Sequence, residues 1–312
     1  MLAQRARTWA GGAVRGGEPA DGPTYLILGP VEIRRGGLPR TPTALKRRAL
    51  LALLLLHANR PSSVDMLVEE LWDGHPPRSA VATLQMYVSG LRRILDPGHS
   101  RDGGDARRHP VLRTAGSGYL LHVGPGELDL DCFRLEAAFG RRLLSAGDCA
   151  AAGEVFRSAL ALWRGRPLGD LDQACLPAYY GVRLEEERLA LVHDRIGADI
   201  CGGRAREVTG ELEELCARHP LREEFHAQLM TALADTGRRA EALDAYTRAR
   251  RTVVENTGIE PGPALQAAQR ALFAGTRPAQ AGHERCRTDS APTRPAGPVY
   301  ASGSRCVVPG RW

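Results

Sequence analysis

Length, composition and charge exclude several classes of protein. The chain has 312 residues, 43% of them hydrophobic, which is long enough for two compact domains. The longest apolar run, residues 49–56, is far shorter than the roughly 18 residues of a membrane span, and the first residues lack the apolar segment of a signal peptide. We therefore expect a two-domain cytoplasmic protein without membrane contacts.

The charge is divided unequally along the chain. Residues 24–124 hold 14 Lys and Arg against 8 Asp and Glu, a net of +6, whereas residues 125–274 hold 19 against 24, a net of −5. A local basic field attracts polyanions. We expect DNA binding in the first half and protein contacts in the second. Ordinary surface charge is the alternative for a net charge of this size.

Cysteine usage indicates a reducing compartment. The seven cysteines form no C-x-x-C pair and have no companion histidine at metal-ligand spacing. They stand singly at Cys132, Cys149, Cys175, Cys201, Cys216, Cys286 and Cys306. We expect reduced thiols in a cytosolic protein, with no metal and no cofactor.

Both ends of the chain differ in composition from the rest. Residues 1–22 and 275–312 are rich in Gly, Ala, Arg and Pro and show no periodicity, so they bury too little apolar area to offset the entropy of ordering. We expect both to be disordered. The remaining chain is divided into a first domain over residues 23–124 and a second over residues 125–274.

The first domain has the element order of a winged helix. Strands are expected at residues 25–28 and 31–34, helices at about 43–58, 64–72 and 79–96, and two further strands at 111–114 and 119–123. A serine before the second helix can cap its free amides, and glycines lie in the turn between the last two strands. The predicted fold class is α+β, a winged helix of the response-regulator output type.

The second domain is periodic as helix throughout and contains a repeat. Gly147, Ala152, Phe156 and Ala159 match Gly237, Ala242, Tyr246 and Ala249 at identical spacing, and a degenerate third copy is Gly203, Val208, Leu212, Leu215 and Pro220. Small residues at these offsets allow one helix of a hairpin to approach its neighbour, while the aromatic residue fills the gap. The pattern predicts an all-α, tetratricopeptide-like domain.

The helix over residues 79–96 is the candidate DNA-reading element. At about 100° per residue, Leu84, Val88, Leu91 and Leu95 form a stripe that must face the core. The opposite side and its flanks carry groups that can bond base edges or phosphates, or contact a thymine methyl. These candidates are Thr83, Gln85, Met86, Ser89, Arg92 and Arg93. A solvated helix face is the alternative.

Further cations flank this helix in the sequence and could contact phosphates. Lys46, Arg47 and Arg48 begin the first helix, Arg78 precedes the third, and Arg107, Arg108 and Arg113 surround the last strands. Together they outline a DNA-binding footprint.

Ordered stretches in both domains resemble one known family. They are LILGPVEI at 26–33, KRRALLALLL at 46–55, VDMLVEELW at 64–72, ATLQMYVSGLRR at 82–93, GYLL at 118–121, GRRAEAL at 237–243 and GIEPGP at 258–263. The sequence resembles the Streptomyces antibiotic regulatory protein family of transcription activators over residues 24–274. In similar winged helices a long or basic residue often stands where this chain has Gly90, which alters the expected base contacts.

The resemblance implies a function that spacing and charge do not. It implies a winged helix that binds direct repeats near promoters, side by side as a possible homodimer on DNA, and a second domain that recruits RNA polymerase holoenzyme. It also implies control of a secondary-metabolite gene cluster. Longer relatives carry a nucleotide-binding domain, but this chain has no G-x-x-x-x-G-K-[ST], so it resembles the short form.

Rival functions fit the sequence less well. An enzyme is disfavoured because the histidines form no ligand pair and no nucleophile motif is present. A helical-repeat interaction scaffold would not need arginines opposite a leucine stripe. A repressor would use the same DNA contacts, so the residues alone do not exclude it. RNA binding is disfavoured because the opening strands carry one aromatic residue, Tyr25.

Overall fold

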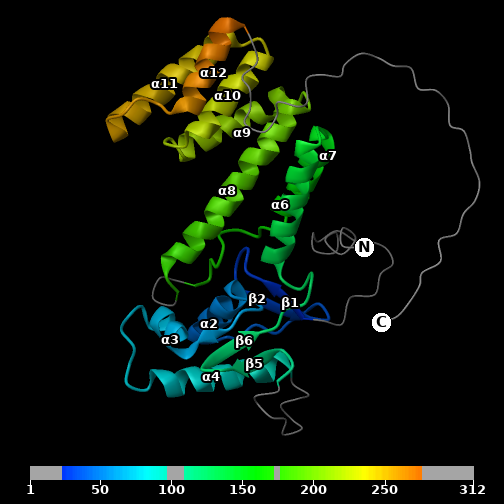
Figure 1. The fold of residues 1–312 in the computed structure, drawn as a ribbon, viewed down its shortest axis with the longest axis vertical. Helices are drawn as coiled ribbons and strands as arrows, with labels where there is room; N and C mark the ends of the chain where they lie inside the picture. Colours follow the sequence, from blue (N-terminus) through cyan, green and yellow to red (C-terminus); the bar gives the residue numbers. More distant parts are fainter. Residues whose placement is uncertain (1–22, 97–108, 172–175, 276–312) are drawn as a thin grey trace, which may run out of the picture.

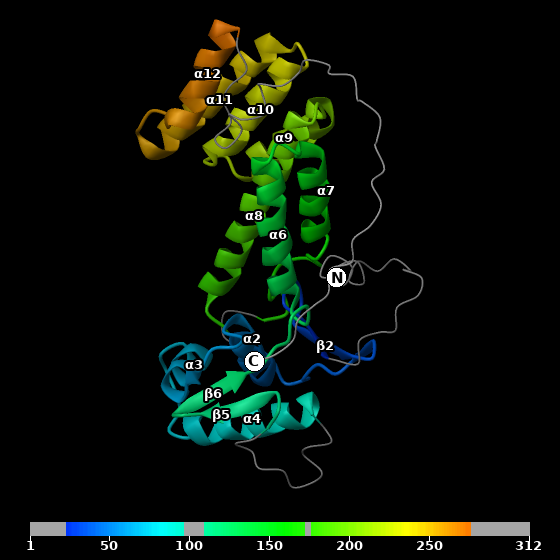
Figure 2. The ribbon, with the colours of Figure 1, turned by 45° about the vertical axis from the view of Figure 1, so that its right-hand side comes forward.

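The first domain lies at one end of an elongated molecule, and the helical repeats extend away from it (Figures 1 and 2). The structure is a computed structural model and describes residues 23–96, 109–171 and 176–275. The tails expected at residues 1–22 and 276–312 lie outside the described residues.

The opening strands form an antiparallel sheet with the order β1-β2-β3. They are β1 (Pro23–Leu26), β2 (Glu32–Arg35) and the short β3 (Leu38–Pro39). The first strand ends at Leu26 and not at the expected Leu28. The reason is that the amides of Ile27 and Leu28 donate to the Asp129 carboxylate, each at 2.9 Å, instead of pairing with a strand.

The three expected helices are present and are α2 (Leu45–Leu56), α3 (Val64–Trp72) and α4 (Ala80–Leu95). Every side chain from Ala49 to Leu55 is buried, which confirms that α2 is the central helix of the core. The Ser63 hydroxyl accepts a hydrogen bond from the amide of Met66 at 3.1 Å and caps α3, as the sequence predicts.

The hairpin of the wing consists of β5 (Leu112–Ala115) and β6 (Gly118–Leu121). A strand missed by the sequence, β4 (Ser62–Ser63), pairs with β6 and gives the order β4-β6-β5. Gly118 is required by this pairing, because a Cβ there would lie 2.0 Å from the carbonyl oxygen of Ser62. The close approach of the Ser62 backbone therefore explains Gly118 better than the geometry of the hairpin turn does.

The second domain consists of three helical hairpins and a closing helix. The helices are α6 (Asp129–Ser145), α7 (Cys149–Leu160), α8 (Ala178–Cys201), α9 (Ala205–Arg218), α10 (Glu223–Asp235), α11 (Arg239–Thr257) and α12 (Pro263–Ala274). Gly147, Gly203 and Gly237 lie in the three hairpin turns with φ of 87°, 80° and 81°. All three repeat copies, including the degenerate one, are therefore confirmed as structural units.

The aromatic residue of the first repeat copy packs closely against a glycine of the preceding helix. A Cβ on Gly140 of α6 would lie 2.3 Å from the ring of Phe156, which is fully buried on α7. Ion pairs also connect successive repeats. Arg134 and Arg141 of α6 bond to Glu187 and Asp194 of α8, each at 2.7 Å.

One hydrophobic core runs from the winged helix into the first repeats, so it does not break at residue 124. At the junction, Tyr25 donates its amide to the carbonyl of Glu127 at 2.7 Å. The fully buried Asp129 carboxylate accepts from the amides of Ile27, Leu28 and Leu130. Burial raises the pKa of Asp129 to about 6, while these hydrogen bonds and the charge of Arg164 oppose the increase. The two domains are joined by these hydrogen bonds and by the shared core, and the expected domain boundary at 124/125 remains a prediction.

The expectation of seven reduced thiols was wrong for two of them. Cys149, the first residue of α7, forms a disulfide with Cys201, the last residue of α8. Their Cα atoms lie 6.0 Å apart, a normal separation for a disulfide. The 52 residues between them in the sequence hid this proximity. Cys132 and Cys216 are free and buried, and burial raises the pKa of their thiols to about 11 and 12.

Candidate DNA interface

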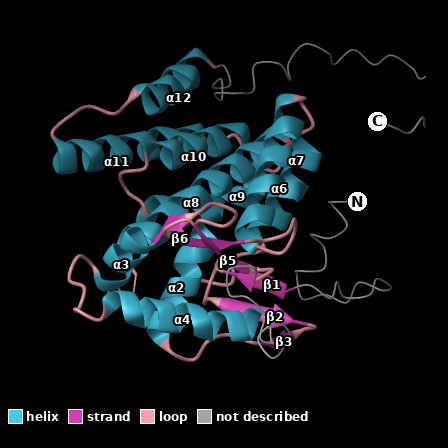
Figure 3. Ribbon diagram, turned by 60° about the horizontal axis from the view of Figure 1, so that its bottom comes forward, coloured by secondary structure: helices cyan, strands magenta, loops and turns pink. Residues whose placement is uncertain are grey.

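Helix α4 forms the end of the molecule that is farthest from α11 and α12, with the β5–β6 hairpin beside it (Figures 1 and 3). Its apolar stripe of Leu84, Val88, Leu91 and Leu95 is at most 2% exposed, as the wheel predicts. The opposite side faces outward and carries Gln85, Met86, Ser89 and Arg93, all exposed. Thr83 is half-buried at the edge of this face. We call the outward side of α4, residues 82, 85, 86, 89 and 93, the α4 face.

Arg92 differs from its expected role as a DNA contact. Its Nε donates to the carbonyl of Leu112 at 3.0 Å and one Nη donates to the Thr114 hydroxyl at 2.9 Å. Its guanidinium also lies 5.9 Å from the centre of the Tyr119 ring. The guanidinium therefore fixes the hairpin against α4. The wheel placed Arg92 on a flank of the helix, where acceptors of the hairpin are within reach.

His109 is a positioning residue that the sequence did not reveal. It is 1% exposed, and its Nδ1 accepts from the amides of Val111 and Leu112 at 3.2 and 3.0 Å. Because Nδ1 is the acceptor, Nε2 carries the proton and donates to the carbonyl of Arg92 at 3.2 Å. This ring connects the end of α4 to the start of β5. The one feature of the sequence that could have indicated this role is the position of His109, directly before Pro110 and the hairpin.

The three cations at the start of α2 have three different environments. Lys46 donates its ammonium to the carbonyl of Leu71, at the end of α3, at 2.5 Å. Arg48 forms an ion pair with Asp170 at the domain junction. That side chain was expected to flank the reading helix, and it instead joins the two domains. Arg47 packs against Gly90 of α4.

The remaining expected cations are exposed where the structure describes them. Arg78 lies in the turn before α4 and Arg113 lies on β5, and both side chains are exposed. Arg107 and Arg108 lie outside the described residues. Among the described residues, exposed cations thus stand before the start of α4, at Arg78, and on the wing, at Arg113.

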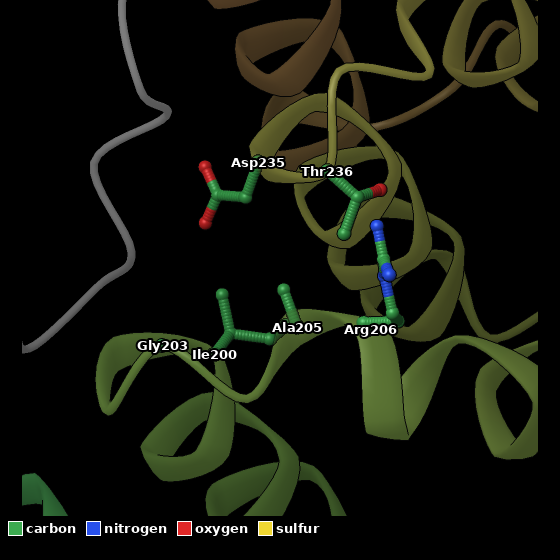
Figure 4. A pocket seen from close by; sticks show the side chains of 6 residues that line it. All are labelled: Ile200, Gly203, Ala205, Arg206, Asp235 and Thr236. Atoms are coloured by element: carbon green, nitrogen blue, oxygen red, sulfur yellow. The ribbon is translucent and has the colours of Figure 1, made fainter.

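A hollow in the second domain does not have the properties of a small-molecule site. It measures about 510 Å³ and lies between the α8–α9 and α10–α11 turns (Figure 4). Ile200 and Ala205 are its only apolar side chains, while Arg206 and Asp235 face it from opposite sides. Small-molecule sites are lined mainly by apolar groups.

In the part of the chain that the structure describes, no helix is long and apolar enough to cross a membrane.

Two family models match consecutive parts of the chain. Residues 41–121 match "Transcriptional regulatory protein, C terminal" and residues 128–273 match "Bacterial transcriptional activator domain". The chain is 38% identical to the regulatory protein DnrI of Streptomyces peucetius over 251 residues, which cover 79% of this chain and 90% of DnrI. The chain belongs to the Streptomyces antibiotic regulatory protein family. Members of this family are DNA-binding transcription activators and not enzymes.

Longer members of the Streptomyces antibiotic regulatory protein family share the same two domains. The regulatory protein AfsR of Streptomyces coelicolor is 37% identical over 278 residues, which cover 87% of this chain and 26% of AfsR. The structure of Mycobacterium tuberculosis EmbR in complex with a low-affinity phosphopeptide superimposes with a TM-score of 0.76 at 34% identity, covering 85% of this chain and 68% of that chain. The fold class, a winged helix followed by helical repeats, is confirmed by this likeness.

Proposed function

We propose that this activator binds direct repeats near the promoters of a secondary-metabolite gene cluster and recruits RNA polymerase holoenzyme through its helical domain. The observation that carries the proposal is the α4 face, an exposed polar surface with small residues on a helix whose other side is buried. Such a helix fits the major groove, where base edges differ in their pattern of donors and acceptors. The protein then acts at the nucleoid in the cytoplasm.

Different side chains of the α4 face contact different parts of the DNA. Gln85 and Arg93 are exposed and bond base edges, with Thr83 at the edge of the face, while Met86 contacts a thymine methyl. Ser89 bonds a phosphate. Arg78 and Arg113 contact phosphates on either side. Arg92 contributes indirectly, because it holds the wing in place.

Arg93→Ala is expected to weaken specific binding by about 1 to 3 kcal/mol, because a side chain that bonds a base edge contributes about that much discrimination. The measurement is a gel-shift titration on the best genomic site. Arg251→Ala is the matched control, since Arg251 is an exposed arginine of α11, far from the wing. Equal affinities for the Arg93→Ala variant and the wild type would remove Arg93 from the set of base contacts.

Chromatin immunoprecipitation followed by in vitro transcription tests the whole proposal. We expect enrichment at a few promoters with two half-sites in direct repeat, occupied by two protomers side by side. Added protein then raises transcription by the purified holoenzyme from those promoters. A decrease in transcript at full occupancy would favour a repressor, and a lack of enrichment would favour an interaction scaffold.

A further inference from the structure

Arg47 is a half-buried cation that has no hydrogen-bond or ion-pair partner among the described residues. Its Nε is buried and has no hydrogen-bond partner, and no ion pair is formed by its guanidinium within the described residues. Its neighbours in the sequence differ. Lys46 bonds to the end of α3 and Arg48 to Asp170. A buried N–H group with no acceptor is costly, and an anion beside Arg47 would supply one for its Nε.

Gly90 determines where this guanidinium lies. A Cβ on Gly90 would lie 3.0 Å from both Cζ and Nε of Arg47 and 3.3 Å from one Nη. The Arg47 side chain thus occupies the space that any larger residue at position 90 would take. Gly90 is buried although its neighbour Ser89 is exposed, so an approach of DNA to the Gly90 backbone does not explain the glycine.

The pair lies at the edge of the α4 face. Gly90 follows Met86 by four residues and precedes Arg93 by three, so the three positions are neighbours on the same side of the helix. Met86 is 58% exposed and Arg93 is exposed. The guanidinium of Arg47, although it comes from α2, therefore lies next to the α4 face. If the α4 face contacts DNA, the anion available at this position is a phosphate of the backbone.

We propose that Arg47 binds one DNA phosphate from the notch that Gly90 leaves in α4, and that Gly90 is the positioning residue for this contact. The inference rests on the proposed DNA-binding role of the α4 face. Similar winged helices often have a long or basic residue at the position of Gly90. In this chain we assign the contact of that residue to Arg47, a cation from α2. The contact anchors the helix and carries no information about base sequence.

A double-mutant cycle measured against salt concentration tests the pair. Arg47→Ala is expected to lower affinity about 5- to 10-fold near 0.1 M salt, equally on specific and unrelated duplexes, and to reduce the slope of log K against log [salt] by about one. Gly90→Ala is expected to change both quantities in the same direction but by less, because the added methyl shifts the guanidinium by a few tenths of an ångström. The double variant is expected to lose no more than Arg47→Ala alone.

Controls separate this contact from loss of structure and from failure of the proposed function. Gly210→Ala on α9 adds a methyl where no atom lies within 4 Å and is expected to leave the salt slope unchanged. A further loss on adding Gly90→Ala to Arg47→Ala would overturn the positioning role of Gly90. An unchanged slope for Arg47→Ala in a wild-type protein that binds would overturn the phosphate contact alone. A wild-type protein that binds no duplex would contradict the proposed function as well.

Discussion

Asp129→Ala is expected to lower the free energy of unfolding by about 3 to 9 kcal/mol, because it leaves three buried amides without an acceptor and each costs about 1 to 3 kcal/mol. Asp129 is fully buried, and its carboxylate accepts from Ile27, Leu28 and Leu130 at 2.8 to 2.9 Å. It lies at the start of α6 and bonds to the backbone that follows β1. Urea denaturation followed by circular dichroism measures the loss.

The expected loss of stability in Asp129→Ala comes from the hydrogen bonds at the domain junction, and not from the loss of a negative charge at the start of a helix. Asp131→Ala is the matched control, because Asp131 also lies in the first turn of α6 and is half-buried. A carboxylate in the first turn interacts favourably with the helix dipole by less than about 1 kcal/mol, and both variants lose that interaction. Equal losses for Asp129→Ala and Asp131→Ala would show that the three amide bonds add nothing.

The second large effect is expected for Cys149→Ser in the oxidised protein, with a loss of about 2 to 4 kcal/mol. The Cys149–Cys201 disulfide closes a loop with a sequence separation of 52 residues and restricts the unfolded chain. It also joins the start of α7 to the end of α8 and so fixes the first repeat to the second. Urea denaturation with and without a thiol reductant measures the effect.

The reductant supplies the control within the same experiment. With the disulfide reduced, we expect wild type and Cys149→Ser to unfold at nearly the same urea concentration. Cys132→Ser is a second control, since Cys132 is free and buried. This variant keeps the disulfide, so the difference in stability between it and the wild type is expected to be the same with and without the reductant. A difference between wild type and Cys149→Ser that persists unchanged in reductant would mean that serine disturbs local packing and that the disulfide contributes nothing.

The features that could be predicted from the sequence are local ones. The leucine stripe of α4 and the cap at Ser63 follow from residues within one or two turns of each other. The repeat follows from a fixed spacing, and even its degenerate copy beginning at Gly203 corresponds to a hairpin. Helical periodicity and turn chemistry are properties of short segments, so these elements need no knowledge of the tertiary fold.

The features that could not be predicted depend on partners distant in the sequence. Arg48 pairs with Asp170, 122 residues away, and the charge of Arg48 alone gave no indication of that partner. Arg92 was assigned to DNA because a helical wheel shows direction but not the acceptors of the neighbouring hairpin. Gly90 was expected to alter the base contacts, whereas its neighbour in space is Arg47. In each case the tertiary contact determines which cations remain available for DNA.

Photo-crosslinking from Met86 tests the central claim, that the α4 face contacts DNA, most directly. The photoreactive p-benzoylphenylalanine replaces Met86, which is 58% exposed, and in a control it replaces Phe273 at the end of α12, which is 71% exposed. We expect ultraviolet light to join labelled promoter duplex to the protein substituted at Met86 and not to the control. Crosslinks from Phe273 but not from Met86, with the duplex bound in both cases, would contradict the account.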